Sequence, residues 1–241
     1  MLLTKRFILA LTLCFAGVGV FAQSANDIVN KYIDAMGGKA KLQQLNSVYE
    51  EISTSAMGQE IPGKVWIVNN KGMRTEMSVM NQKIVTVMTK DTGWMVNPLM
   101  GNSDPQPLPI DQVKESASKL DLRGQLLDYA AKGYTLTLLG KEAVAGKDNF
   151  KLKLVKGGQA FTFFIDASTY LITKVAADAK ISGQDINTEV EFSDYKKTAE
   201  GYTFPNTTTI HMNAGAAMEV KSVITKVTVN PTVDPQLFLK P

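Results

Sequence analysis

Short apolar segments, separated by only a few turn-forming residues, run through most of this sequence and restrict the folds it can adopt. Expected strands in the first half are 47–56, 61–69, 73–80, 83–89 and 92–97, separated by MGQE, NNKG, NQ and KDTG. In the second half they are 134–143, 148–156, 160–166, 170–182, 186–197, 202–213 and 216–229. Gaps this short leave no room for crossover helices, so neighbouring strands should pair antiparallel.

Helical patterns occur at two places. Residues 24–46 should form two short helices divided by Gly37-Gly38, with Asn26 or Asp27 as the first cap. Their apolar stripe is Ile28, Tyr32, Ile33 and Met36. Residues 110–130 contain Ile110, Val113, Ala117 and Leu120 at helical spacing, followed by Leu122, Leu126, Leu127 and Tyr129, which suggest a second short helix. The segment 98–109 between strands and helices carries four prolines, so we expect it to be neither strand nor helix.

These elements predict a mainly β protein with helices, built on one antiparallel sheet of about 11–12 strands. A sheet of that size must curl or close, and helices are available to cover its concave face. No long linker and no repeat divides the sequence. We therefore expect a single domain at 23–241.

Residues 1–22 have the layout of a cleaved signal peptide. Lys5 and Arg6 precede an apolar run from Phe7 to Val20, and cleavage is expected after Ala22. Cys14 raises the alternative of a lipoprotein anchor, but Leu13 is not the small residue that such a signal requires. The run is also shorter than the ~20 residues of a membrane span. An exported, periplasmic protein without cysteine is expected.

Composition and motifs argue against nucleic-acid binding, metal chemistry and catalysis. The formal charge is +3 before loss of Lys5 and Arg6, and basic residues never cluster beyond two in a row. His211 is the only histidine, which excludes His-rich metal sites, and no G-x-S-x-G motif accompanies it. We expect no enzyme, no cofactor and no metal site. A hydrolase that uses a carboxylate pair remains a minor alternative.

Apolar side chains occupy both faces of the expected central strands. Six of the 11 methionines lie within 73–100. A sheet packed on both faces would explain the pattern, and so would a curved sheet whose concave face lines an apolar cavity. Methionine favours the cavity, because its unbranched side chain adapts to ligands of variable shape.

The order of these pieces resembles the periplasmic outer-membrane lipoprotein carriers, the Lol-type carriers, and their lipoprotein-sorting relatives. The similarity rests on six stretches: IVNKYIDAMGGKAKLQQLNSV, GKVWIVNNKGMRTEM, TKDTGWMVNPLMG, FTFFIDASTYLITKV, FSDYKKTAEGYTFP and VNPTVDPQLFLKP. They span nearly the whole chain after residue 22, in the right order. This resemblance implies an unclosed antiparallel barrel with Ile110–Ala130 as a lid over the cavity. Carriers of this family place an arginine at the end of the second strand, where it holds the lid. This sequence has Asn69 and Asn70 there, and Arg74 on the next strand.

The residues expected to line the cavity are Trp66, Met77, Val79, Val85, Val87, Met88, Trp94, Met95, Val113, Ala117, Leu120 and Phe163. The resemblance implies a monomeric carrier that binds acyl chains of a lipoprotein or lipid for transfer toward the outer membrane. Its partners would be inner- and outer-membrane transfer proteins. The alternative is an envelope sensor or protein-interaction module of the same fold without a transport role.

Overall fold

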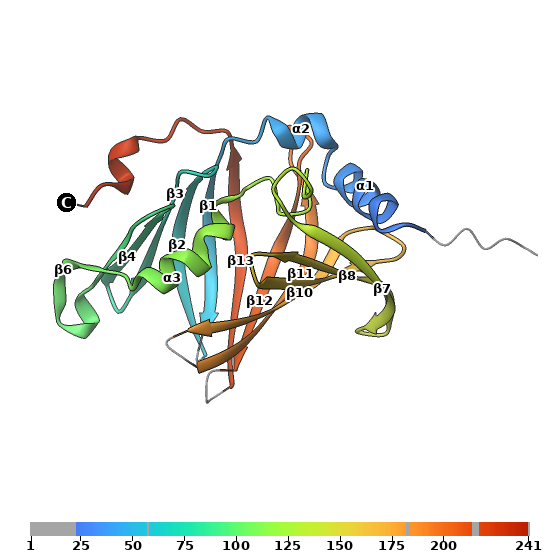
Figure 1. Cartoon of the computed structure of the whole chain (residues 1–241). Helices are drawn as coiled ribbons and strands as arrows, with labels where there is room; N and C mark the ends of the chain where they lie inside the picture. The colour runs from blue at the N-terminus through green and yellow to red at the C-terminus, as the bar shows by residue number, and fades with distance from the viewer. Residues whose placement is uncertain (1–22, 57, 182–183, 214–216, 241) are drawn as a thin grey trace, which may run out of the picture.

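The structure is a computed structural model that describes residues 23–240 except 57, 182–183 and 214–216. The expected signal peptide (1–22), including Cys14 and the cleavage point after Ala22, lies outside these residues. The described chain forms a curved, unclosed antiparallel sheet of 13 strands, with helices on its concave face and at one end (Figure 1). The expected fold class is confirmed, with more strands than the 11–12 expected.

The strands are β1 (Ser47–Ala56), β2 (Gln59–Val68), β3 (Gly72–Val79), β4 (Gln82–Thr89), β5 (Gly93–Asn97), β6 (Asn102–Pro107), β7 (Thr135–Val144), β8 (Lys147–Lys156), β9 (Gln159–Asp166), β10 (Ile172–Ile181), β11 (Gln184–Lys197), β12 (Thr203–Asn213) and β13 (Ala217–Val229). The α-helices are α1 (Ala25–Ala35), α2 (Lys39–Gln43) and α3 (Ile110–Ser116). Three 3-10 turns complete the described elements: η1 (Pro98–Met100), η2 (Ala117–Leu120) and η3 (Pro235–Phe238).

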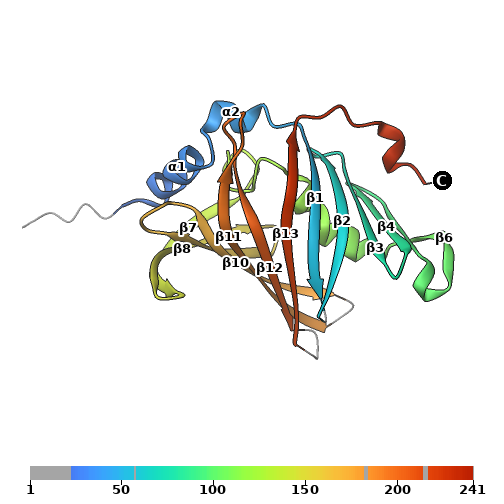
Figure 2. The ribbon, with the colours of Figure 1, turned by 180° about the vertical axis from the view of Figure 1, so that it is seen from behind.

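The strand order shows how the chain is wound. It runs β6-β5-β4-β3-β2-β1-β13-β12-β11-β10-β9-β8-β7, so the first and last strands pair in the middle and β6 and β7 lie at opposite edges. The connection from β6 to β7 must therefore cross a face of the sheet. Its helix α3 contacts β4 in one half and β10 in the other. Figures 1 and 2 show α3 on the concave side, behind β13 and β1 when the molecule is turned round.

Tight turns join the strands where the sequence indicated. Met80 and Asn81 have φ values of 49° and 62° and form the two-residue loop between β3 and β4. Two positive φ angles in a two-residue loop match the right-handed twist of the flanking strands. Met80, expected as the last residue of a strand, thus lies in the turn, and its exposed fraction is 74%.

The proline-rich segment differs from expectation. Residues 102–107 form β6, although Pro105 and Pro107 belong to it, and η1 precedes it. β6 pairs only with β5 and is an edge strand. Proline is tolerated there because one side of an edge strand needs no hydrogen-bond donors. The expectation that 98–109 holds neither strand nor helix was wrong, and β6 is the additional strand.

The N-terminal helices are confirmed, but their cap is not the expected one. Ser24 caps α1: its Oγ accepts from the Asp27 N–H (3.1 Å), and its own N–H donates to the Asp27 carboxylate (3.2 Å). Neither Asn26 nor Asp27 is the cap itself; Asp27 is the third helical residue of a capping box.

The second helix suggested after Leu120 is absent from the described structure. Residues 121–134 form consecutive turns, in which Gly124 and Asp128 have φ values of 79° and 53°. Left-handed residues interrupt an α-helix. Leu126 and Leu127 are nevertheless almost fully buried. The apolar pattern of this segment therefore indicated which residues are buried, but not that they form a helix.

The main hydrophobic core lies at one end of the curved sheet, where α1 and the 121–134 turns cover β8 and β9. Its most buried members are Ile28, Leu45, Val48, Leu126, Leu152, Leu154 and Ile165. Because these side chains come from the N-terminal helices and from the middle of the chain, the core ties α1 to the β7–β9 half of the sheet.

Leu152 on β8 tests this core. Its side chain is 0% exposed, so Leu152→Ala leaves a cavity and should lower the free energy of unfolding by about 2–5 kcal/mol in urea denaturation. Leu139→Ala on the neighbouring strand is the control, because Leu139 is 51% exposed. Equal losses for the two variants would contradict the placement of Leu152.

Candidate functional site

The strand register identifies which side chains share the concave face. Directly opposed residues of an antiparallel pair point to the same side of the sheet. One row crosses seven strands from β13 to β7 and is apolar throughout: Val220, Ile210, Val190, Val175, Phe163, Leu152 and Leu138. Its members Phe163 and Leu152 belong to the core under α1, so this is the covered face. We call it the inner face.

The other half of the sheet continues the apolar inner face. One row from β13 to β5 consists of Val229, Val48, Ile67, Met73, Met88 and Gly93. Another consists of Ile224, Ile52, Gly63, Met77 and Ile84. The methionines of 73–100 that lie within strands thus fall largely on this face.

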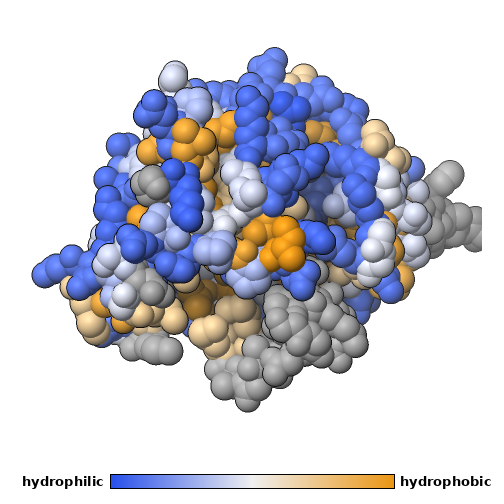
Figure 3. All heavy atoms as spheres, turned by 60° about the vertical axis from the view of Figure 1, so that its left-hand side comes forward, coloured by the Kyte–Doolittle hydropathy of each residue, from blue (hydrophilic) through white to orange (hydrophobic). Residues whose placement is uncertain are grey.

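Burial along these rows is uneven. At the two ends the side chains are packed: Leu152 is 0% exposed and Met88 8%. In the middle, Val48 and Val65 are also buried. Ile52, Met77 and Ile210 are only half-buried. We call this apolar, partly solvent-accessible middle of the inner face the hollow. Figure 3 brings the β3–β6 side of the molecule forward and shows an apolar group near the centre of this view, with polar residues around it.

The twelve residues expected to line a cavity divide into two sets. Five strand residues lie on the inner face by register: Met77, Val79, Met88, Met95 and Phe163. Three lie on the lid, where Val113 and Leu120 are buried and Ala117 is half-buried. Phe163 is 5% exposed within the main core, away from the half-buried middle.

The remaining four, Trp66, Val85, Val87 and Trp94, lie on the opposite, outer face. Trp66 lies opposite Arg74, Arg74 opposite Val87, and Val87 opposite Trp94, so these side chains share one face. Met73 and Met77 are one and three residues from Arg74 on β3 and therefore point to the other face. The expectation that all twelve residues share one cavity is therefore wrong for these four. Successive residues of a strand point to opposite faces, so only a shift of the strand register would bring these four side chains to the inner face.

Three of these four residues have a different partner, and the Trp66 ring contacts that of Tyr49. Val85, Val87 and Trp94 form a second buried cluster, against which Phe238 of η3 packs. Arg74 donates to the Leu237 carbonyl (2.9 Å) and pairs with Glu76 (2.7 Å), which fixes η3 over these strands. The two-faced apolar pattern thus has two causes: a hollow on one face and a C-terminal cover on the other.

The lid helix α3 docks where the sheet lacks a side chain. Gly93 belongs to the inner face of β5, and an added Cβ would lie 3.1 Å from Val113 Cγ2 and 2.9 Å from Leu108 Cδ1. Glycine therefore permits the close approach of α3, and Val113 is 1% exposed. Ile110, expected on the apolar side of the helix, is instead 54% exposed at its start.

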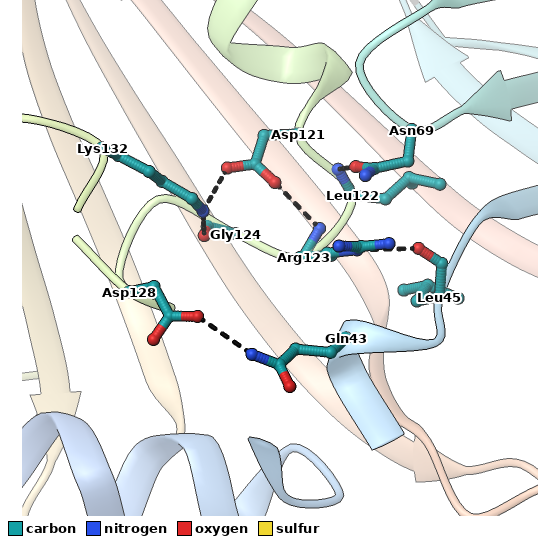
Figure 4. A network of polar contacts seen from close by, with 9 residues as sticks. All are labelled: Gln43, Leu45, Asn69, Asp121, Leu122, Arg123, Gly124, Asp128 and Lys132. Carbon is teal, nitrogen blue, oxygen red and sulfur yellow. Dashed lines mark hydrogen bonds and ion pairs between the residues drawn. The ribbon is translucent and has the colours of Figure 1, made fainter. Parts of the chain in front are cut away.

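Asparagines hold the far end of the lid. The Asn69 side-chain oxygen accepts from the Leu122 N–H (3.0 Å) (Figure 4). The Asn70 N–H donates to the Leu120 carbonyl (2.7 Å). These residues lie at the end of β2, where the resemblance led us to look for an arginine that holds the lid. The lid is thus fastened to the end of β2 without it, while Arg74 serves the outer face.

Charged side chains stiffen the segment after the lid. Arg123 donates through Nε to the Leu45 carbonyl (3.2 Å), and Lys132 pairs with Asp121 (2.5 Å) and donates to the Gly124 carbonyl (2.8 Å) (Figure 4). These contacts join the 121–134 turns to the residues just before β1. The lid segment is consequently attached at both of its ends.

One carboxyl interrupts the apolar inner face. Glu50 lies in the row Val227, Glu50, Val65, Thr75, Thr86 and Met95. Val48 and Ile52 flank it on its own strand. Burial raises the pKa of the Glu50 carboxyl from 4.5 to about 7. The sequence contains a sign of this site: Glu50 lies at a position of β1 where the alternation of Val48 and Ile52 predicts an apolar residue.

Glu50 should make stability depend on pH. The folded chain binds a proton at Glu50 up to about pH 7 and the unfolded chain only up to about 4.5, so stability falls as pH rises through this window. Glu50→Gln removes the effect and should stabilise the protein at pH 8 by up to about 3 kcal/mol relative to wild type, with little difference at pH 4. Urea denaturation across this range measures it.

Glu51→Gln is the matched control. Glu51 is on the outer face, and the Tyr49 hydroxyl hydrogen bond lowers its pKa. This variant should show no stabilisation at pH 8. Glu50→Gln that follows the wild-type pH profile would contradict the burial of the Glu50 carboxyl.

An open pocket of about 500 Å³ lies beside α2, lined by Lys41, Gln44, Glu200, Tyr202 and Asn230 among others, outside the hollow. Within the described ranges, no cluster of three or more histidine, cysteine or acidic residues is placed to hold a metal ion. Among the helices described, none has the length and apolar character needed to cross a membrane.

No family model and no curated protein matches this chain. Solved structures do. A LolA superfamily protein from Nitrosomonas europaea has a TM-score of 0.59 at 15% identity, covering 91% of this chain and 99% of that chain. A DUF1329 family protein from Desulfovibrio piger has a TM-score of 0.58 at 13% identity, covering 90% and 98%.

A putative outer membrane lipoprotein-sorting protein domain from Vibrio parahaemolyticus has a TM-score of 0.55 at 12% identity, covering 89% of this chain and 95% of that chain. Similarity at this level of identity establishes the fold. The resemblance to the lipoprotein carriers is therefore confirmed at the level of architecture: this chain has the fold of the LolA superfamily and of lipoprotein-sorting domains.

Proposed function

We propose that this protein is a periplasmic, non-enzymatic carrier that shelters acyl chains of a lipoprotein or lipid in the hollow and delivers them toward the outer membrane. The observation that carries the proposal is the half-buried apolar middle of the inner face, placed beneath a lid that is fastened at its ends. Inner-face residues proposed to contact the ligand are Met77, Val79 and Met95, with Ala117 above them on the lid. The fold shared with lipoprotein-sorting domains supports the same assignment.

An apolar hollow is sufficient for useful affinity. Burying a chain of ~14 methylenes at ~0.8 kcal/mol each contributes on the order of 11 kcal/mol before the costs of ordering the ligand and the lid. Methionine side chains at 73, 77, 88 and 95 adapt to chains of different length and saturation. Release requires that the lid open, because α3 lies across the face that the ligand contacts.

A charge placed in the hollow should abolish binding. Met77→Glu puts a carboxylate on the inner face, and the cost of burying it against an acyl chain should reduce affinity for a fluorescent fatty acid by at least about tenfold. Ser78→Glu is the control, because Ser78 is the next residue on β3 and is exposed on the outer face. Titrations by fluorescence compare the two folded variants.

The wild-type result decides the proposal itself. Protein purified from its native host should carry co-eluting lipid, detectable by native mass spectrometry. Absence of lipid together with no binding of the fluorescent fatty acid at pH 5.5, where the Glu50 carboxyl is protonated, would exclude the carrier. It would leave the sensor or protein-interaction module as the assignment.

The asparagine at the end of β2 should set the rate of ligand exchange. Asn69→Ala removes the acceptor of the Leu122 N–H, a hydrogen bond worth about 0.5–1.5 kcal/mol. Faster hydrogen exchange at the Leu122 amide and a roughly 2- to 12-fold faster release of fatty acid should follow. Asn69→Asp keeps the oxygen and should restore both rates. Unchanged exchange at Leu122 in Asn69→Ala would show that this contact does not restrain the lid.

A further inference from the structure

Glu50 is the one acidic side chain that the register places among the inner-face rows of β1–β5. The residues directly opposite it are Val227 and Val65, and the rows on either side contain Val48 and Ile52. Within the part of the chain that the structure describes, its carboxyl makes no hydrogen bond or ion pair. A carboxyl in apolar surroundings is costly unless something satisfies it.

Charged groups of the surrounding elements are engaged elsewhere. The inner-face residues of β2, β3, β4 and β13 around Glu50 are apolar or carry hydroxyls. On the turns that follow the lid, Asp121 pairs with Lys132, and Arg123 binds the Leu45 carbonyl and the Asn46 side chain. Lys64 and Glu51 belong to the outer face. Lys114 and Lys119 of the lid are exposed, and no described cation forms an ion pair with Glu50.

The same row continues with polar groups. Thr75 lies two strands from Glu50, with Val65 between them, and Thr86 follows on the next strand. At about 4.8 Å between strands, Glu50 and Thr75 are roughly 10 Å apart, the span of a small headgroup. The apolar rows above and below this pair would contact acyl chains on either side of such a headgroup.

We propose that Glu50 is a headgroup site within the hollow, with Thr75 two strands away in the same row, and that it selects amphiphiles that end in a hydrogen-bond donor, above all a primary ammonium, and disfavours those that end in a carboxylate. This proposal rests on the proposed function and specifies its ligand. An ammonium donates to the Glu50 carboxylate and compensates its charge, which makes a charge-assisted hydrogen bond. A carboxylate ligand would place two like charges in the same apolar space.

Three probes with the same chain test the site: dodecylammonium, dodecanol and dodecanoate, each below the concentration at which it forms micelles. At pH 8 the wild-type protein should bind dodecylammonium about tenfold or more tightly than dodecanol, and dodecanoate most weakly. Glu50→Gln should reduce the preference for the ammonium and strengthen binding of dodecanoate. Glu51→Gln, on the outer face, should leave the order unchanged. Calorimetric titration measures all three affinities.

A pH series on the unaltered protein provides a second measurement that needs no variant. The raised pKa of Glu50 means that its carboxyl is protonated at pH 5.5, whereas dodecylammonium and dodecanol do not change charge between pH 5.5 and 8. The preference for the ammonium over the alcohol should therefore fall at the lower pH in wild type and stay constant in Glu50→Gln.

The outcomes separate the two proposals. If none of the probes binds, both the carrier function and the headgroup site are wrong. If all three bind with an order that Glu50→Gln and pH leave unchanged, the carrier function stands and the headgroup site is wrong.

Discussion

The connection from β6 to β7 is the constraint on which the rest of this structure depends. These strands are the two edges of one sheet, so the 27 or so residues between them must pass over a face rather than round an end. A curved sheet offers its shorter path on the concave side. The order of the strands thus requires that a segment cover the concave face. The side chains of the β6–β7 connection determine only how tightly this segment is held there.

Two kinds of contact share that task. Val113 packs against Gly93, where the absence of a Cβ lets the helix approach, and Asn69 binds the backbone just past η2. The first contact is apolar and buried, and the second is a hydrogen bond to a half-buried side chain. Because few contacts hold this segment, we expect its opening to cost less free energy than unfolding of the core under α1.

Much of the architecture could be predicted from the sequence, because tight turns and alternating strands are local features. The helices of 24–46 and the hairpins were found in this way. β6 was missed because its prolines exclude a central strand, and only the strand order reveals that it is an edge. The turns at 121–134 were taken for a helix because the burial of Leu126 and Leu127 produces the same spacing as a helical stripe.

The candidate site was harder to predict, for a physical reason. Alternation shows that Val87 and Met88 point to opposite faces, but both are apolar, and no local pattern distinguishes a hollow from a surface covered by η3. That cover comes from residues more than 130 positions away, so Trp94 and Val85 could not be assigned from their neighbours. Glu50 is the opposite case, because it is a charged residue at an otherwise apolar position of β1. This single exception indicates a candidate ligand contact more specifically than the abundance of methionine does.

The pairing of β1 with β13 has a consequence for how the molecule is made. The first strand is joined along its whole length to the last, across some 170 residues of chain, and a bulge between Glu51 and Ile52 interrupts their register. Until the last strand is present, one edge of β1 has unpaired backbone groups, and this is the strand type that templates association between molecules. Non-local pairing of this kind also slows folding. During synthesis, therefore, the incomplete chain has an unpaired strand edge and an apolar face that nothing covers, and it is most prone to aggregation before β13 has been made.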